Sequence, residues 1–149
     1  MNVDIARALS TDRVIDITTT GRVSGTPHRI EIWFFRVGDD LYLTGAPGAV
    51  RAWYRNLEAE PDFTVHLKQS LEADLPARAH RVTEPAEREA ILRAILAGFT
   101  PVIPPEWMPG RTDAERQATE TMFAAIQADP DAVLPQWLAE SPLVRIELK

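Results

Sequence analysis

The 149-residue sequence contains no cysteine. Without thiols the chain can form no disulfide, and it offers no cysteine nucleophile, thiolate zinc site or cysteine-held iron–sulfur cluster. Positive charge is also scarce, because 16 Lys and Arg stand against 22 Asp and Glu and give a net charge of −6. We therefore expect no general attraction to nucleic acid or to an anionic membrane. Any redox chemistry must come from a bound cofactor.

Long apolar runs are missing as well. No stretch approaches the roughly 20 residues of a membrane-spanning helix, and Asp4 lies where a signal peptide carries basic residues. We expect a cytoplasmic chain with no membrane span. The fingerprints G-x-G-x-x-G, the P-loop and H-E-x-x-H are absent, and residues 21–25 place their serine one position too late for G-x-S-x-G. The length and the ordinary composition, 45% hydrophobic and 26% charged, predict a single domain over residues 1–149.

Hydrophobic alternation and β-branched residues predict about six strands. They cover residues 14–20, 28–37, 41–44, 63–67, 74–82 and 143–148. The first three are expected to form an antiparallel meander, since polar turn residues separate them. Pro76 favours an edge strand or a bulge in the fifth. Closure of these strands into a small barrel would hide their edges.

Helical spacing predicts the other elements. The chain opens on a short amphipathic helix with Val3, Ala6 and Leu9 on one side. A second helix is expected over Ala49–Glu60, with Val50, Trp53, Tyr54 and Leu57 at helical spacing. A helical block over residues 84–140 precedes the last strand, and Thr112 to Glu115 has the form of a capping box. The fold class is therefore mainly β with helices (α+β).

The most informative stretch for chemistry is the loop between the first two strands. Hydroxyls, glycines and two arginines within a few residues suit phosphate oxygens, because guanidinium groups and backbone N–H groups both bind them. The candidates are Thr20, Arg22, Ser24, Gly25 and Arg29. The alternative is a solvated β-turn with incidental arginines.

A second loop, Gly45-Ala46-Pro47-Gly48, opens the helix that carries Trp53. A helix N-terminus offers free N–H groups and partial positive charge, so the two loops would form a joint anion site at one mouth of the barrel if they meet. The alternative is that the glycines only permit a tight turn and that Trp53 and Tyr54 belong to the core.

Three segments together resemble the deazaflavin (F420)-dependent nitroreductase family. They are Ile17-Thr18-Thr19-Thr20-Gly21-Arg22-Val23-Ser24-Gly25 with Arg29, then Leu41-Tyr42-Leu43, then Trp53-Tyr54-Arg55-Asn56-Leu57-Glu58-Ala59-Glu60-Pro61. The resemblance covers residues 14–68 and implies a split β-barrel related to pyridoxamine-phosphate-oxidase-like flavin-binding proteins. It implies coenzyme F420 as the cofactor, or FMN as in relatives.

Carried over residue by residue, the resemblance implies that Arg22, Ser24, Gly25 and Arg29 bind the phosphate and ribityl portion of the cofactor. Residues Thr44 to Gly48 would lie along it, and Thr20 and Trp53 complete the predicted cofactor-binding set. The sequence departs from the family at Val23, where many members have lysine, and in the 45–48 loop, which is shorter and lacks a common lysine. An FMN-binding oxidoreductase and a non-catalytic carrier of a flavin or hydrophobic ligand therefore stay open as alternatives.

The predicted activity is hydride transfer from reduced F420 to a small activated acceptor such as a nitroaromatic compound, a quinone or an enone. No catalytic side chain is predicted, because the cofactor carries the chemistry.

His28, His66 and His80 lack metal-ligand spacing, and no metal is expected. The segment 99–109, rich in proline and apolar residues, is a lid over the substrate, a contact of a homodimer or a core-covering loop. Glu31 shares a strand face with Arg29 and is expected to pair with it.

Overall fold

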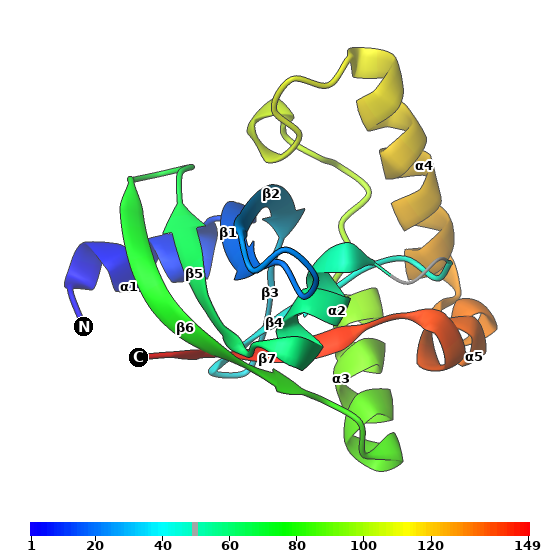
Figure 1. Ribbon diagram of the computed structural model, residues 1–149. Helices are drawn as coiled ribbons and strands as arrows, with labels where there is room; N and C mark the ends of the chain where they lie inside the picture. Colours follow the sequence, from blue (N-terminus) through cyan, green and yellow to red (C-terminus); the bar gives the residue numbers. More distant parts are fainter. Residues whose placement is uncertain (49–50) are drawn as a thin grey trace.

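The computed structural model describes residues 1–48 and 51–149 (Figure 1). Its described residues form one antiparallel sheet with the strand order β2-β1-β5-β6-β7-β4-β3. The strands are β1 (Val14–Thr20), β2 (Pro27–Trp33), β3 (Phe35–Val37), β4 (Asp40–Thr44), β5 (Asp62–Leu67), β6 (Ala73–Arg81) and β7 (Leu143–Leu148). Among these residues no helix is both long and apolar enough to cross a membrane.

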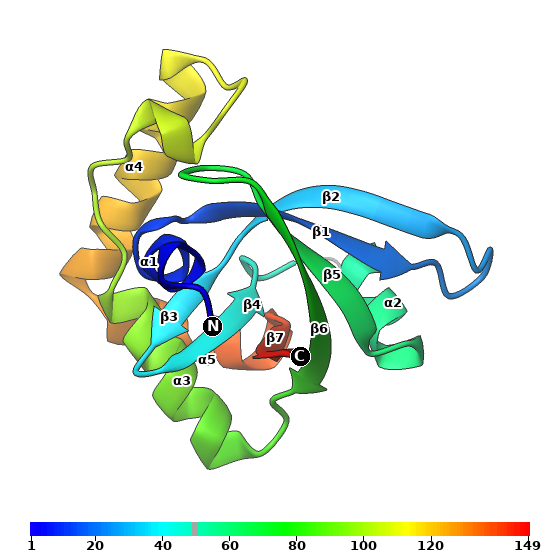
Figure 2. The same ribbon diagram turned by 90° about the vertical axis from the view of Figure 1, so that its left-hand side faces the viewer.

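The sheet curls into a half-barrel whose two edge strands are β2 and β3 (Figure 2). The expected single strand over residues 28–37 is divided at Phe34. Up to Trp33 the chain pairs with β1, and from Phe35 it pairs with β4. The backbone N–H of Phe34 donates to the carbonyl of Arg13 at 3.0 Å. This change of partner raises the number of strands from about six to seven, while the first-to-second and second-to-third pairings of the meander are confirmed.

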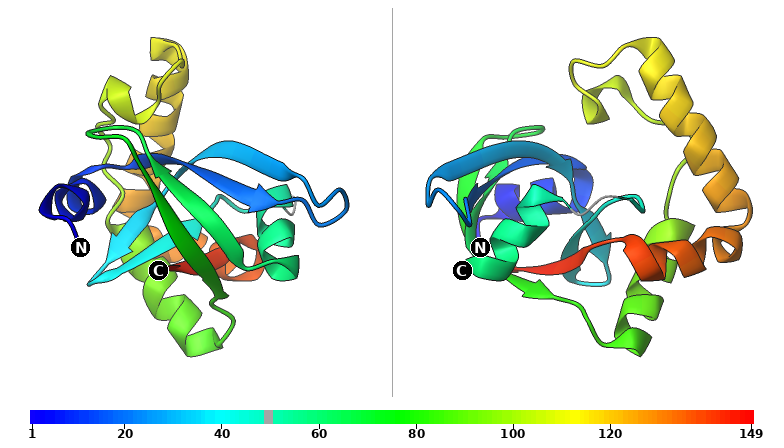
Figure 3. Two further views of the ribbon diagram at one scale, coloured as in Figure 1. Left: turned by 60° about the vertical axis from the view of Figure 1, so that its left-hand side comes forward. Right: turned by 45° about the vertical axis from the view of Figure 1, so that its right-hand side comes forward.

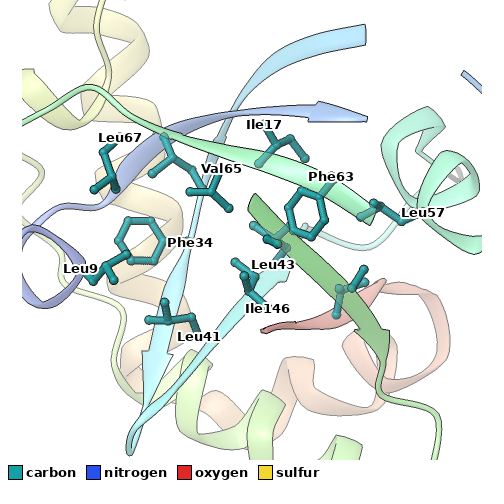
Figure 4. Close-up of a cluster of buried hydrophobic side chains, with 14 of the residues drawn as sticks. Leu9, Ile17, Phe34, Leu41, Leu43, Leu57, Phe63, Val65, Leu67 and Ile146 are labelled. Carbon is teal, nitrogen blue, oxygen red and sulfur yellow. The ribbon is translucent and has the colours of Figure 1, made fainter. Parts of the chain in front are cut away.

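The inner face of the half-barrel holds one hydrophobic core (Figure 4). Ile15, Ile17 and Leu43 are at most 1% exposed, and each stabilises the fold by about 1.5–3 kcal/mol relative to an exposed side chain. Helix α1 (Val3–Thr11) adds Ala8 and Leu9 to this core. Of the predicted face of α1, Leu9 is buried as expected, whereas Ala6 is exposed and Val3 is 70% exposed. Helix α2 (Ala52–Ala59) adds Trp53 and Leu57, as its spacing predicts.

A second core lies between the strands β3, β4 and β7 and the helical block. The block contains α3 (Pro85–Ala97), the short 3-10 helix η1 (Pro105–Trp107), α4 (Asp113–Ala128) and α5 (Pro130–Glu140). Figure 3 shows α4 and the segment before it projecting from one side of the sheet. Outward-facing residues of the strands, such as Phe35 and Tyr42, pack against this block. The helices thus cover a sheet face that would otherwise expose aromatic side chains.

Local signals explain several element boundaries. The predicted capping box begins α4: Thr112 Oγ1 accepts from the Glu115 backbone at 3.1 Å, and the Glu115 side chain accepts from the Thr112 backbone at 3.4 Å. Ala49 and Val50 of the second predicted helix lie outside the described residues. Pro76 lies in an inner strand rather than an edge strand. It occupies the point where β6 reaches the end of β7, and its carbonyl accepts from the N–H of Lys149 at 3.0 Å.

Candidate functional site

The loop between β1 and β2, residues 21–26, is closed by its own backbone. The N–H of Gly21 donates to the carbonyl of Thr26, and the N–H of Gly25 donates to the carbonyl of Gly21, both at 2.8 Å. Gly25 has a φ of 72°, a conformation that glycine adopts without steric cost. A Cβ atom on Gly21 would lie 2.5 Å from Nε2 of His28. Glycine at position 21 therefore lets the His28 ring pack against the loop backbone.

Asn56 of α2 anchors this loop. Its Oδ1 accepts from the backbone N–H of Arg22 at 3.1 Å and from Nη1 of Arg22 at 3.3 Å. Its Nδ2 donates to Oγ1 of Thr19 at 3.1 Å. Asn56 is 5% exposed and Thr19 is 2% exposed, so these bonds replace water inside the protein. One buried amide thus fixes the loop, the Arg22 side chain and the end of β1 relative to α2.

A cavity of about 370 Å³ opens beside this loop, and we call it the loop cavity. Arg22, Ser24 and His28 bring a guanidinium group, a hydroxyl and an imidazole to its wall, and α2 contributes its first turn. These are donors that suit an oxyanion. The full lining comprises Thr19, Gly21, Arg22, Val23, Ser24, His28, Ile30, Ala52, Trp53 and Asn56.

A larger cavity of about 480 Å³, the aromatic cavity, lies between the sheet and the helical block. Most of its wall is aromatic or apolar. It is lined by Glu31, Ile32, Trp33, Phe35, Thr44, Gly45, Ala46, Phe99, Trp107, Met108, Arg111, Glu115, Thr119, Met122, Phe123 and Trp137. A cavity of this size with few polar groups suits a flat organic molecule.

Aromatic contacts hold the wall of this cavity together. Nε1 of Trp33 donates to the carbonyl of Trp107 at 2.7 Å. The Trp33 ring meets Trp107 and Phe123 edge to face, with centroids 6.0 and 5.6 Å apart. The guanidinium group of Arg13 lies 5.1 Å from the Trp107 ring and 5.7 Å from Phe35, and burial lowers the pKa of Arg13. Arg13 therefore supports the cavity wall from behind through cation–π contacts.

The two cavities adjoin along β2. Ile30 lines the loop cavity, and its neighbours Glu31 and Ile32 line the aromatic cavity. In the described residues β2 pairs only with β1, so its other edge is free of strand partners. Neighbouring residues of β2 thus line the two cavities, and in the described part of the chain the strand edge beside them carries no further strand.

The structure divides the predicted cofactor residues between these cavities. Arg22, Ser24 and Trp53 line the loop cavity, whereas Thr44, Gly45 and Ala46 line the aromatic cavity. Thus the glycine loop meets the start of α2 at the loop cavity, and Gly45 and Ala46 of the second loop line the neighbouring cavity. The remaining predicted residues, Thr20, Gly25, Arg29, Pro47 and Gly48, line neither cavity.

Arg29 lies on the outer face of β2, opposite Thr18. Its Nε donates to Oδ2 of Asp16 at 2.9 Å. The expected pairing of Glu31 with Arg29 is wrong, because Glu31 accepts from Lys68 Nζ at 2.5 Å. Side chains alternate across a strand, which places Arg29 with Asp16 and turns its neighbour His28 toward the loop cavity.

His28, Asn56 and Thr19 are the residues of the loop cavity that sequence reasoning missed. A period-two signal was available for two of them. Since Ile15 and Ile17 face the core, Thr19 must share their face, and His28 pairs with Thr19 across the hairpin. Nothing local in the sequence indicates the contact of Asn56, because its partner lies 34 residues away.

The polar groups of the aromatic cavity are already paired. Glu115 accepts from Arg111 Nη1 at 3.2 Å. Hydrogen bonds from the backbone of Thr112 and from Arg111 hold the pKa of Glu115 below its ordinary value, so this group is ionised at neutral pH. Among the described residues, no three His, Asp or Glu side chains are placed to hold a metal ion.

The half-barrel with its flanking helices has known counterparts. A conserved hypothetical protein from Mycobacterium tuberculosis superposes with a TM-score of 0.64 at 17% identity, covering 100% of this chain and 81% of the other. A putative 5-nitroimidazole antibiotic resistance protein from Bacteroides thetaiotaomicron gives 0.59 at 11% identity, with coverages of 100% and 80%. A putative pyridoxamine 5'-phosphate oxidase from Listeria innocua gives 0.55 at 13%, with coverages of 98% and 91%. These likenesses define the fold as a split barrel of the pyridoxamine-phosphate-oxidase type.

A family model described as F420H(2)-dependent quinone reductase matches residues 1–102 of the 149. The chain therefore belongs to the F420H(2)-dependent quinone reductase family, and its family cofactor is coenzyme F420. The matched residues include the whole loop cavity, whereas much of the wall of the aromatic cavity, including Trp107 and Phe123, lies beyond residue 102.

Proposed function

We propose that this protein holds F420 along β2 and reduces a small acceptor in the aromatic cavity. The observation that carries the proposal is that neighbouring residues of β2 line two cavities, one with Arg22, Ser24 and His28 in its wall and one rich in aromatic side chains, in a chain of the F420H(2)-dependent family. When bound, reduced F420 supplies a hydride to the acceptor.

The residues present fit the cofactor. Arg22, Ser24 and the loop backbone would hold the phosphate, with His28 and the start of α2 beside them. The lack of a side chain at Gly21 keeps this wall open, because a Cβ there would also approach Oγ of Ser24 to 2.6 Å. The backbone of Thr44 to Ala46 and the ring of Trp33 would hold the deazaflavin ring and the acceptor.

The protein's own contribution is to orient the two reactants. The aromatic side chains of the wall would pack against a flat acceptor, and one side of the cavity stays open to solvent. Reduction of a quinone or nitro acceptor needs a proton besides the hydride. Because Glu115 is held ionised, we propose that this proton comes from water at the open side of the cavity. Quinones, nitroaromatic compounds and enones remain the proposed acceptors.

A side-by-side titration with F420 and FMN tests the cofactor. Trp53 lines the loop cavity and Trp33 the aromatic cavity, so bound cofactor should quench tryptophan fluorescence. We expect F420 to bind more tightly than FMN, and Arg22→Gln to weaken F420. Arg78→Gln is the matched control, because Arg78 is an exposed arginine on β6 that pairs with Asp62. A preference for FMN would instead support the flavin alternative.

Steady-state turnover separates an enzyme from a carrier. We expect F420H2 to be oxidised when a quinone or a nitroaromatic compound is added, and Trp107→Ala to raise KM for the acceptor more than it changes F420 affinity. F420 binding without turnover of any acceptor would favour the carrier alternative.

We also propose that the protein is a cytoplasmic homodimer. The apolar segment 99–109 supports the dimer, since its Val102 side chain is 69% exposed and exposed apolar side chains on a surface mark interfaces. Light scattering of the purified protein decides this point, and a monomer at all concentrations would contradict it.

A further inference from the structure

A third cavity, of about 360 Å³, lies behind the Thr44–Gly45 segment. It is formed where the start of α2, the first turn of α3 and the end of α5 meet. Its lining consists of Arg51, Tyr54, Thr83, Arg88, Leu138, Ala139, Glu140, Ser141 and Pro142. None of these residues lines the loop cavity or the aromatic cavity.

Two buried polar atoms of this lining lack partners. Ser141 is 5% exposed, and its Oγ has no hydrogen-bond partner among the described residues. The same holds for Nη1 of Arg51. A buried polar group without a partner destabilises the fold, so each such group calls for a specific explanation. Both belong to walls of the same cavity, and a ligand that accepts hydrogen bonds from both explains them together.

The other polar groups of the cavity favour an anion. Arg88 is fully engaged, since its guanidinium donates to the carbonyls of Val82, Leu138 and Ser141 at 2.9–3.2 Å. Its positive charge remains, and with Arg51 it outweighs the single carboxylate of Glu140. Arg51 is also the N-cap of α2 and makes no side-chain capping bond, so the first N–H groups of this helix add partial positive charge.

We propose that this third cavity binds an oxyanion, a phosphate or carboxylate group, with Arg51 and Ser141 as its ligands. Both residues line the cavity, their unpaired donor atoms are buried away from it in this conformation, and a rotamer change of each side chain would turn its donor toward the ligand. A guanidinium group and a hydroxyl group can each donate a hydrogen bond to one oxygen of a phosphate or carboxylate. The source is a free phosphate or carboxylate, because the proposed function places the phosphate of the coenzyme in the loop cavity.

Binding of an oxyanion in the third cavity would affect the wall of the aromatic cavity. A Cβ on Gly45 would lie 2.7 Å from Cζ of Arg51, so this guanidinium group packs against the loop that lines the aromatic cavity. On the other side, Oγ1 of Thr44 donates to the carbonyl of Pro142 at 2.5 Å. The ligand would thus fix Arg51 and, through it, the position of Gly45.

Thermal unfolding of the cofactor-free protein tests the proposal. Sodium phosphate and sodium glutamate are titrated against sodium chloride of equal ionic strength in a buffer free of other oxyanions. We expect the oxyanions to raise the Tm of the wild type, because a ligand that binds only the folded state stabilises it. Ser141→Ala should lower the affinity about tenfold without lowering the Tm of the anion-free protein, since the hydroxyl removed has no partner. Arg51→Gln should abolish the response.

Arg55→Gln is the matched control, because Arg55 lies on the same helix but is exposed and contacts Glu58 at 4.0 Å. It should respond as the wild type does. The source of the oxyanion is resolved by measuring the affinity of each variant for F420 and for the deazaflavin that lacks the phosphate. An effect on the Tm response alone assigns the site to a free anion. A loss of affinity with Arg51→Gln for F420 alone would place the phosphate of the coenzyme here and would overturn both the free-anion assignment and its proposed position in the loop cavity.

The proposal is overturned if Arg51→Gln and Ser141→Ala change neither the anion response nor the affinity for F420, in which case water fills the cavity. Failure of the wild type to bind F420 would contradict the proposed function but would leave the free-anion response as an independent test of this site.

Discussion

Replacement of Asn56 by alanine is the sharpest test of how the loop cavity is built. The substitution removes the acceptor of the Arg22 backbone N–H and the donor to Thr19 Oγ1. The buried Thr19 hydroxyl left without its partner costs about 1–3 kcal/mol, and the part-buried N–H of Arg22 costs about 1 kcal/mol, the low end of that range, because water reaches it. The bond to the Arg22 guanidinium adds little, because water replaces it at an exposed side chain. We therefore expect a loss of about 2–4 kcal/mol in the free energy of unfolding.

Urea unfolding followed by tryptophan fluorescence measures this loss. With a denaturant slope of about 2 kcal/mol per molar, the midpoint should fall by about 1–2 M. A typical domain has about 5–15 kcal/mol of stability, so the variant should remain folded and can be titrated with F420. We expect it to bind F420 more weakly than the wild type, because the loop and Arg22 are no longer held against α2.

A double-mutant cycle with Thr19→Val isolates the buried amide–hydroxyl bond. Its coupling energy should be about 0.5–1.5 kcal/mol, the net value of a neutral hydrogen bond. Arg55→Ala, an exposed change on the same helix, should stay within about 0.5 kcal/mol of the wild type. If Asn56→Ala also stays within that limit, the assignment of Asn56 as the anchor of the loop is wrong.

Three further predictions follow from contacts described above. Gly21→Ala should displace the His28 ring, because its Nε2 would lie 2.5 Å from the new Cβ. We expect weaker F420 binding with little change in Tm, since the flexible His28 side chain can move away. Unchanged F420 affinity would contradict this prediction. Arg13→Met should lose cation–π contacts worth about 1–2 kcal/mol and speed amide hydrogen exchange around Trp107, and unaltered exchange there would contradict the support assigned to Arg13. Partial burial would raise the pKa of Asp16, but Lys68 and Arg29 outweigh that effect and hold the pKa below its ordinary value. The stability that these ion pairs give to the fold is full above the unfolded pKa of about 3.9. It is lost as pH falls through the lower folded pKa. Asp16→Asn should therefore flatten the stability profile in that acidic range, and an unchanged profile would argue against the ion pairs.

Local sequence signals predicted most of the elements. Residues 14–20 and 143–148 form strands with the expected bounds, because β-branched and alternating residues leave few alternatives. The capping box at Thr112 is likewise confirmed, since all its groups lie within four residues. The break at Phe34 was not predictable in this way. It depends on which strand pairs with each side, and Trp33 and Phe35 have the same apolar character in sequence.

The candidate site shows the same limit. The loop with Arg22 and Ser24 was recognisable as a cluster of donors, and the structure places both residues on one cavity. The structure places His28 on the loop cavity and pairs Arg29 with Asp16, and the strand period of two explains why neighbouring residues differ in this way. The wall of the aromatic cavity lay beyond reach, because Trp33 and Trp107 are separated by 74 residues and no local pattern relates them.

The division of the aromatic cavity along the chain has an evolutionary consequence. The strands and loops that form the loop cavity end before residue 102, whereas Trp107, Met108, Arg111 and Phe123 lie in a later, mostly helical segment. If the aromatic cavity holds the acceptor as proposed, substitutions in that segment would change acceptor preference while the residues of the loop cavity stay unchanged. Exchange of residues 103–129 between relatives would then transfer acceptor preference from one protein to another.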